Sequence, residues 1–248
     1  MKINIADNYE EMSKMAAEHI IQAVQRKPNA LLSIAGGSTP LGMLRYLIEA
    51  SRENRVSFAE CKFVSLDEWV GLGGGDEGSC RSTLDQHFFE PLSIREDQIR
   101  FYDGRSPDLE GECEKTDLFV KEHGPIDVIV LGVGLNGHLG FNEPGCEMDT
   151  YSHIVELDDV TRAVSVKYFS EQKNLNHGIT LGMKHIMEST DVMLLADGDK
   201  KAEIVKATAL GEMTEQVPSS LLREHGRFEL FLDERAASLI RNPKPGEA

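Results

Sequence analysis

Apolar segments of five to eight residues alternate with segments of helical periodicity along most of the chain. This alternation constrains the fold more than any other feature of the sequence. The apolar segments are continuous, which indicates strands that are buried on both faces. They are ALLSIA (30–35), KFVSL (62–66), IRFYD (99–103), IDVIVLGV (126–133), DVMLLAD (191–197) and FELFLD (228–233). Such strands with helices between them predict a three-layer, doubly wound α/β fold, Rossmann-like, with a mostly parallel sheet.

The first helix is expected to run from Asn8 to Arg26, with Asp7 as its cap and Glu10 completing a capping box. Further helices are predicted over 40–50, 79–89, 109–122, 200–209 and 234–240. Neither a repeat nor a linker interrupts the pattern, so residues 1–248 are predicted to form one α/β domain. The last eight residues, RNPKPGEA, are expected to be a frayed tail.

The charge balance excludes some classes of partner. The chain has 26 Lys and Arg against 42 Asp and Glu, a formal net charge of −16. Nucleic acids and anionic membranes need clustered cations, so neither is expected as a partner. No apolar run is long enough to span a bilayer, and the N-terminus lacks the apolar centre of a signal peptide, so we expect a cytoplasmic protein.

The four cysteines, Cys61, Cys80, Cys113 and Cys146, are far apart and form no CxxC pair. A disulfide framework is not expected in a chain of this size without a secretion signal. The cysteines also have no histidine at metal-ligand spacing, so we predict no metal site.

A glycine-rich loop follows the segment 30–35. Gly36, Gly37, Ser38 and Thr39 lead into Pro40, which suits the first position of a helix. Glycines let a backbone approach a ligand, and a helix N-terminus offers free N–H groups to a phosphate. The alternative is an ordinary strand-to-helix turn in which Ser38 or Thr39 caps the helix.

Two acidic residues, Asp67 and Glu68, follow the segment 62–66. Ligands of α/β sheets bind beyond the carboxyl ends of the strands, so a carboxylate there is well placed to be a general base. The alternative is that Asp67 caps a turn and Glu68 is solvated.

The stretch LGVGLNGHLGFNEPG (131–145) follows the apolar segment IDVIV. Its glycines permit a backbone course that neither a helix nor a strand would follow. His138 can titrate near neutral pH, and Glu143 can orient its tautomer or share its proton. A hydrogen-bonded structural histidine is the alternative, but the glycines and the nearby carboxylate favour a functional one.

These blocks resemble the glucosamine-6-phosphate deaminases, also called isomerases. The resemblance extends from GGSTP (36–40) to GDKKA (198–202), and GHLGFNEPG (137–145) is its most specific part. GGSTP looks more like the 6-phosphogluconolactonases, but that family usually has a Ser-Leu-Phe-Pro-Gly type of stretch after the Gly-His pair. LDEWVGL (66–72) also resembles the deaminases, because an aromatic residue follows the acidic pair where lactonases usually have arginine.

The resemblance implies a reaction and roles for four residues. The family opens the ring of an amino-sugar 6-phosphate, moves a proton from C2 to C1, and releases ammonia, without a metal or organic cofactor. Asp67 matches the acid/base for the C2 proton, His138 the residue that opens the ring, and Glu143 its support. Asn136 stands where many members have the aspartate of a relay with the histidine, and it can orient the imidazole only by hydrogen bonding.

The resemblance also implies the phosphate contacts. Gly37, Ser38 and Thr39 match the glycine-rich cradle, and Lys201 matches a phosphate-binding lysine. In TRAVSVKYF (161–169), Arg162 matches a family arginine, and Lys167 replaces a phosphate-binding arginine of many members. Lysine keeps the charge but loses the bidentate geometry, so galactosamine 6-phosphate competes with glucosamine 6-phosphate as the expected substrate. Arg81 is a further cation near the second loop.

Two other classes of function stay open. A 6-phosphogluconolactonase would need only an activated water and a grip on the phosphate. A sugar-phosphate-binding domain of a regulator would need a DNA-binding segment. The first predicted helix begins as early as Asn8 and the net charge is strongly negative, so this function is not favoured. The short C-terminal part favours a monomer or small homo-oligomer over the hexamers of larger family members.

Overall fold

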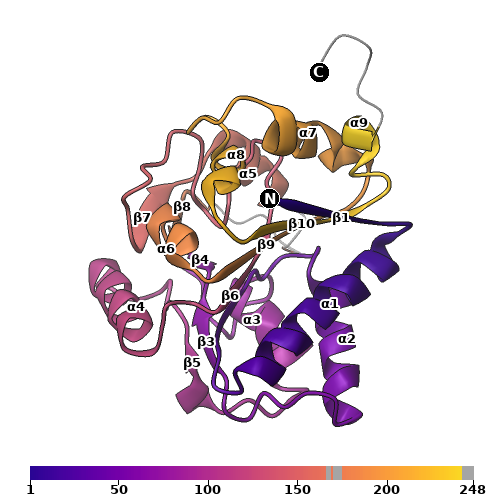
Figure 1. Ribbon diagram of the computed structural model, residues 1–248. Helices are drawn as coiled ribbons and strands as arrows, with labels where there is room; N and C mark the ends of the chain where they lie inside the picture. The colour runs from indigo at the N-terminus through magenta and orange to yellow at the C-terminus, as the bar shows by residue number, and fades with distance from the viewer. Residues whose placement is uncertain (166–168, 170–174, 242–248) are drawn as a thin grey trace.

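The computed structural model describes residues 1–165, 169 and 175–241, and a seven-stranded parallel sheet forms its centre (Figure 1). The strand order is β1-β10-β9-β6-β2-β3-β5, and every pair in it is parallel. The strands are β1 (Lys2–Ala6), β2 (Leu31–Ile34), β3 (Lys62–Ser65), β5 (Ile99–Arg100), β6 (Val128–Gly132), β9 (Asp191–Ala196) and β10 (Phe228–Asp233). The predicted doubly wound α/β class is confirmed.

The direction of winding reverses between β2 and β6. From β2 the chain adds β3 and β5 on one side, then returns to place β6 against the other side of β2. At such a switch point the loops after the two central strands separate and leave a crevice. The loops that follow β2 and β6 are the two glycine-rich loops of the sequence.

Helices cover both faces of the sheet (Figure 1). One face carries α1 (Tyr9–Arg26) and α2 (Leu41–Arg52), and the other carries α4 (Leu109–His123), α6 (Met183–Glu188), α7 (Ala202–Leu210) and α8 (Pro218–Leu221). Successive side chains of one strand enter different cores: Val128 and Val130 of β6 pack with the α1 side, and Ile129 and Leu131 with the α4 side. This two-sided burial explains why the strands are continuously apolar.

The N-terminal segment differs from the prediction. Residues Lys2–Ala6 form β1, which pairs with β10 at the sheet edge, although the sequence pattern predicted no strand before the helix expected from Asn8. The pattern failed because two of the five residues are polar and an edge strand needs little apolar character. The cap of α1 is Asn8, whose extended backbone lets its side chain accept from the N–H of Glu11, so the predicted capping box of Asp7 and Glu10 is wrong.

The C-terminal end of the described chain also differs in detail. The predicted helix over 234–240 is reduced to α9 (Ser238–Arg241), after turns at 234–237. The buried carboxylate of Asp233 accepts from the N–H of Ala236 and of Gly198, which fixes the chain in a turn directly after β10. The predicted frayed tail lies outside the described residues, apart from Arg241.

A second, antiparallel sheet was not predicted. It consists of β4 (Asp67–Trp69), β8 (His177–Thr180) and β7 (His153–Glu156), in the order β4-β8-β7. Asp67 therefore begins a short strand directly after the turn of the chain at Leu66, instead of lying in a loop. Strands of three and four residues are too short to show a period in the sequence.

Two more helices complete the site region: α3 (Cys80–Leu84), capped by Ser79 and continued by a π-helix over Asp85–Phe89, and α5 (Asp159–Ser165). Together α3 and the π-helix occupy the predicted segment 79–89. Within the described part of the chain, no helix is both long and apolar enough to cross a membrane.

The central strand β6 allows a test of the two-sided core. Ile129 is 0% exposed, and Ile129→Ala is expected to lower the free energy of unfolding by about 2–5 kcal/mol, because it leaves a cavity at the centre of the sheet. The matched control Leu118→Ala, at a side chain of α4 that is 53% exposed, should change it by less than about 0.5 kcal/mol. Urea unfolding followed by circular dichroism measures both, and equal effects would contradict this assignment of the core.

Candidate active site

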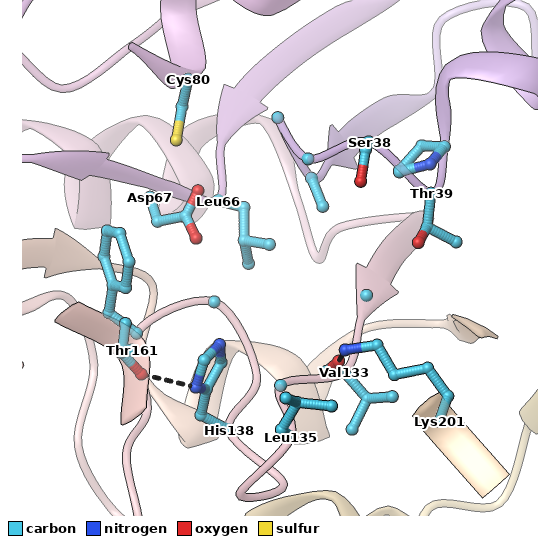
Figure 2. A pocket seen from close by; sticks show the side chains of 18 of the residues that line it. Ser38, Thr39, Leu66, Asp67, Cys80, Val133, Leu135, His138, Thr161 and Lys201 are labelled. Carbon is cyan, nitrogen blue, oxygen red and sulfur yellow. Dashed lines mark hydrogen bonds between the residues drawn. The ribbon is translucent and has the colours of Figure 1, made fainter. Parts of the chain in front are cut away.

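A cavity of about 290 Å³ lies at the switch point of the sheet (Figure 2). Its walls come from the segments that follow β2, β3, β6 and β9, together with residues of α3 and α5. Segments distant in sequence therefore meet at the carboxyl edge of the sheet, where α/β proteins bind ligands. Leu66, Trp69, Val133 and Phe141 give the cavity apolar wall surface.

Residues 36–39 line one end of the cavity and lead into α2. A Cβ on Gly36 would come within 2.8 Å of the Cα of Cys80, so glycine permits the close packing of this loop against α3. The structure gives no side-chain cap to α2, whose N-cap is Pro40, so capping by Ser38 or Thr39 is wrong. The hydroxyl of Thr39 instead donates to a carboxylate oxygen of Asp197, 2.8 Å away.

Two lysines line the same part of the cavity. Lys200 and Lys201 belong to the 3₁₀ turn at Asp199–Lys201 that precedes α7. The Nζ of Lys201 lies 2.6 Å from the carbonyl oxygen of Val133, which brings the ammonium group from the α7 side to the loop after β6 (Figure 2). An anion held between the 36–39 loop and these lysines would meet positive charge together with the backbone N–H groups of a helix start.

Asp67 lies across the cavity from Thr39 and Lys201, and its carboxylate faces into the cavity (Figure 2). Only 9% of the residue is exposed. Burial raises the pKa of Asp67 to about 6, while hydrogen bonding from the thiol of Cys80 and the charge of His138 act in the lowering direction. A carboxylate of this kind is basic enough to take a proton near neutral pH and still returns it readily.

The neighbouring Glu68 is fully buried. The alternative that Glu68 is solvated is therefore wrong. Its carboxylate accepts from the backbone N–H groups of Trp69, Cys80 and Arg81, at 2.9–3.0 Å. Burial raises its pKa to about 7, against the lowering by these three donors. Glu68 thus attaches β4 to the first turn of α3 and fixes Cys80 beside Asp67.

His138 reaches the cavity from the loop after β6. Its Nδ1 lies 3.0 Å from the Thr161 hydroxyl and 3.3 Å from a carboxylate oxygen of Glu143, and the other ring nitrogen points into the cavity (Figure 2). A Cβ on residue 134 would come within 2.4 Å of Nδ1, so Gly134 is required where the loop folds back over the ring. Burial raises the pKa of Glu143, but its hydrogen bonds and the charge of His138 hold that pKa below the ordinary value.

The side chain of Asn136 contacts Glu143, which supports His138, and does not contact the imidazole ring. The amide nitrogen donates to Glu143 (3.0 Å) and to Asp158 (3.3 Å), and the amide oxygen accepts from the backbone N–H of His138 (3.2 Å). The ring nitrogen that an acidic relay residue would contact is instead beside Thr161 and Glu143. Asn136 therefore orients the loop and the carboxylate of Glu143.

The structure does not bring all expected cations into the cavity. The guanidinium of Arg162 donates to the carbonyl of Leu157 (2.6 Å) and pairs with Asp159, and Arg162 does not line the cavity. The guanidinium of Arg81 is held between Asp85 and Glu96, also away from the cavity lining. Lys167 lies outside the described residues.

Cys80, Thr161 and Asp197 line the cavity, but sequence reasoning did not select them. Asp197 directly follows an apolar strand, which is the signal that selected Asp67, so it could have been found. Thr161 and Cys80 have no such signal, because only the fold brings their segments to the cavity. Among the described residues, no group of three or more His, Cys, Asp or Glu side chains is placed to hold a metal.

The fold and the cavity together define a doubly wound α/β protein whose switch-point cavity is lined by a carboxylate and a histidine. The chain belongs to the family described as "Glucosamine-6-phosphate isomerases/6-phosphogluconolactonase", whose model matches residues 5–231. A glucosamine-6-phosphate deaminase of Thermoanaerobacter sp. (strain X514) is 38% identical over 241 residues, which cover 97% of this chain and 95% of the relative. Another, of Clostridium botulinum (strain Eklund 17B / Type B), is 36% identical over 245 residues, 98% of each chain.

Solved structures give the same grouping. A monomeric glucosamine-6-phosphate deaminase superposes with a TM-score of 0.93 at 34% identity, covering 96% of this chain and 100% of that one. The 6-phosphogluconolactonase of Trypanosoma brucei superposes with a TM-score of 0.72 at 20% identity, covering 96% of this chain and 97% of that one. The second likeness shows the shared fold alone. The resemblance stated from the sequence is confirmed.

The contact of Cys80 with Asp67 yields a test of the site's electrostatics. Cys80→Ser should lower the pKa of Asp67 below about 6, because a hydroxyl is a stronger donor than a thiol, and Cys80→Val should raise it by removing the donor. Carboxyl-detected ¹³C NMR titration measures the pKa, and Asp67→Asn identifies the signal. Cys113→Ser, at a buried cysteine of α4, is the control and should change nothing. Shifts of the same sign in both Cys80 variants would contradict the donor role.

Proposed function

We propose that this enzyme opens the ring of glucosamine 6-phosphate, isomerises it and releases ammonia to give fructose 6-phosphate. One observation carries the proposal: Asp67 and His138 both face a cavity whose other end is formed by the 36–39 loop and Lys201 (Figure 2). An acid/base pair and an anion-binding end fit a sugar phosphate whose reacting carbons lie away from its phosphate. The high similarity to glucosamine-6-phosphate deaminases over nearly the whole chain supports the choice of reaction and a place in amino-sugar metabolism.

In the proposed complex, the phosphate binds to the backbone N–H groups of Gly37, Ser38 and Thr39 and to the ammonium of Lys201. C1 and C2 of the sugar then lie between His138 and Asp67. Lys167 stays a further predicted phosphate ligand. Arg162 would reach the substrate only after leaving its contacts with Leu157 and Asp159.

Ring opening needs a group that takes the proton of the C1 hydroxyl and delivers one to the ring oxygen. The inward nitrogen of His138 fits this role, because its Nδ1 is fixed by Thr161 and Glu143. The anionic Glu143 stabilises the imidazolium that forms during the transfer, as the carboxylate of a catalytic triad does. Asn136 keeps Glu143 in place by donating to it.

In the open-chain form the C2–H bond lies next to the C1 carbonyl group, which makes the C2 proton acidic enough for a carboxylate base. Asp67 takes the proton from C2 and returns it to C1 through an enolamine, the amino counterpart of an enediol. Water then adds to the resulting C2 imine, and ammonia leaves as the C2 carbonyl of fructose 6-phosphate forms. The raised pKa of Asp67, near 6, serves both halves of the proton transfer, since the same group must accept and then donate. The apolar walls at Leu66 and Trp69 keep Asp67 out of water and so maintain that pKa.

Galactosamine 6-phosphate, which would give tagatose 6-phosphate, stays the alternative substrate, because it differs only at C4. The structural relative described as monomeric supports the predicted monomer or small homo-oligomer for this chain. The predicted cytoplasmic location stays a prediction.

Purified protein should release ammonia from a hexosamine 6-phosphate in the presence of a chelator. Asp67→Asn should lower kcat by about 10²–10⁴, because it keeps the shape of the side chain but removes the base. Its affinity for fructose 6-phosphate, which carries the same phosphate, should change little, and the fluorescence of Trp69 in the cavity wall reports that binding.

The substrate panel for this assay contains glucosamine 6-phosphate, galactosamine 6-phosphate and 6-phosphogluconolactone. Hydrolysis of the lactone without ammonia from either amino sugar would reject the deaminase. Normal turnover by Asp67→Asn would reject only the base assignment.

The phosphate end is tested separately. Lys201→Ala should raise KM about tenfold to a hundredfold, because a charge-assisted hydrogen bond contributes about 1.5–3 kcal/mol. Steady-state kinetics of ammonia release measure this change, with Lys121→Ala at an exposed position of α4 as the control. An unchanged KM in Lys201→Ala would place the phosphate elsewhere.

A further inference from the structure

A carboxylate lies at the end of the cavity that is proposed to bind phosphate. Asp197 directly follows β9 and lines the cavity together with Thr39, Lys200 and Lys201. Its Oδ1 accepts the hydrogen bond of the Thr39 hydroxyl at 2.8 Å. A negative side chain beside an anion site opposes the anion, so it calls for a physical explanation.

The hydrogen bond decides what this pair of side chains offers to a ligand. A hydroxyl has one hydrogen, and that of Thr39 is donated to Asp197, so the free sites on both side chains are lone pairs. Toward a ligand in the cavity, the pair therefore acts as acceptors. An oxyanion without a proton has only acceptors and is repelled, whereas one that carries a proton can donate it to Asp197.

The surrounding charges keep the site attractive for anions. Lys200 and Lys201 supply positive charge, and the charge of Arg235 also acts on Asp197. Arg235 is paired with Asp199, and Asp233 at the end of β10 accepts from the N–H of Gly198, so these two nearby carboxylates have different partners. Asp197 is thus the carboxylate of the loop that lines the cavity.

We propose that Asp197 is a specificity-determining residue, which accepts a hydrogen bond from a protonated phosphate oxygen and so selects phosphate and phosphomonoesters over fully ionised oxyanions such as sulfate. The inference rests on the proposed function for the location of the phosphate. It adds to that function the ionisation state in which the phosphate is recognised. The second ionisation of a phosphomonoester has a pKa near 6, so both states are present in cells.

The test is a comparison of inorganic phosphate and sulfate at about pH 6, where much phosphate carries a proton and sulfate carries none. Both anions are titrated into the wild type, Asp197→Asn and the control Asp199→Asn. Binding is followed by the fluorescence of Trp69, which is the one tryptophan of the chain and lies in the cavity wall. Isothermal titration calorimetry repeats each titration, so that a silent tryptophan does not hide binding.

The wild type should bind phosphate about tenfold or more tightly than sulfate. Asp197→Asn should reduce this preference to less than about threefold, mainly because sulfate binds more tightly once the negative charge is gone. Asp199→Asn should keep the wild-type ratio, since that carboxylate faces Arg235.

An unchanged phosphate-to-sulfate ratio in Asp197→Asn would overturn the proposal. So would equal weakening of both anions, which would mean that Asp197 only positions the loop through Thr39, and so would a wild type that binds neither anion. The proposed deaminase is tested apart from this, by ammonia release. Loss of selectivity in Asp197→Asn with no ammonia from the wild type would reject the deaminase and support the anion selectivity.

Discussion

The parallel pairing of β2 with β6 is the constraint on which the site depends. The register Leu32↔Val128 to Ile34↔Val130 ends both strands at the same edge of the sheet, although about a hundred residues separate them. The chain reverses its winding direction at this pair, so the two following loops separate and leave a crevice between them. In the proposed function each loop has one role: the 36–39 loop offers N–H groups, and the 133–143 loop offers His138 and Glu143.

The second constraint is the buried carboxylate of Glu68. A fully buried carboxylate is stable only where donors replace water, and three backbone N–H groups do so. Two of these belong to the first turn of α3, whose partial positive charge favours an anion. Because Glu68 holds that turn against β4, its neighbours Asp67 and Cys80 meet at the cavity. From the sequence Glu68 looks like the solvated member of an acidic pair, but its hydrogen bonds organise the surroundings of Asp67, the proposed base.

The sequence was sufficient for the main sheet and for the residues that directly follow its strands. Continuous apolar segments report burial on both faces, and polar residues after them report the carboxyl edge, so Asp67, His138 and the 36–39 loop could be found. Thr161 and Cys80 could not, because they belong to short helices whose position depends on long-range contacts, such as Glu68 with α3. The orientation of Arg162 could not be predicted from the sequence either. Its guanidinium can pair with the nearby acidic residues Glu156 and Asp159 as well as with a ligand, and the sequence does not show which contact forms.

The strongly acidic composition and an anionic substrate are compatible because of the short range of the forces concerned. At physiological ionic strength the screening length is about 8 Å, so most of the net charge of −16 has little effect inside the cavity. The affinity is decided by the groups that line it, where Lys200 and Lys201 outnumber Asp197 at the phosphate end. Asp67 at the other end is largely neutralised by its raised pKa when the pH is below about 6, and it becomes anionic above that pH. A base with this pKa is therefore ionised at neutral pH, next to a C2 amino group whose ammonium form it attracts. In the proposed complex the same electrostatics orient the substrate, because the phosphate then faces the lysines and the amino carbon faces the carboxylate.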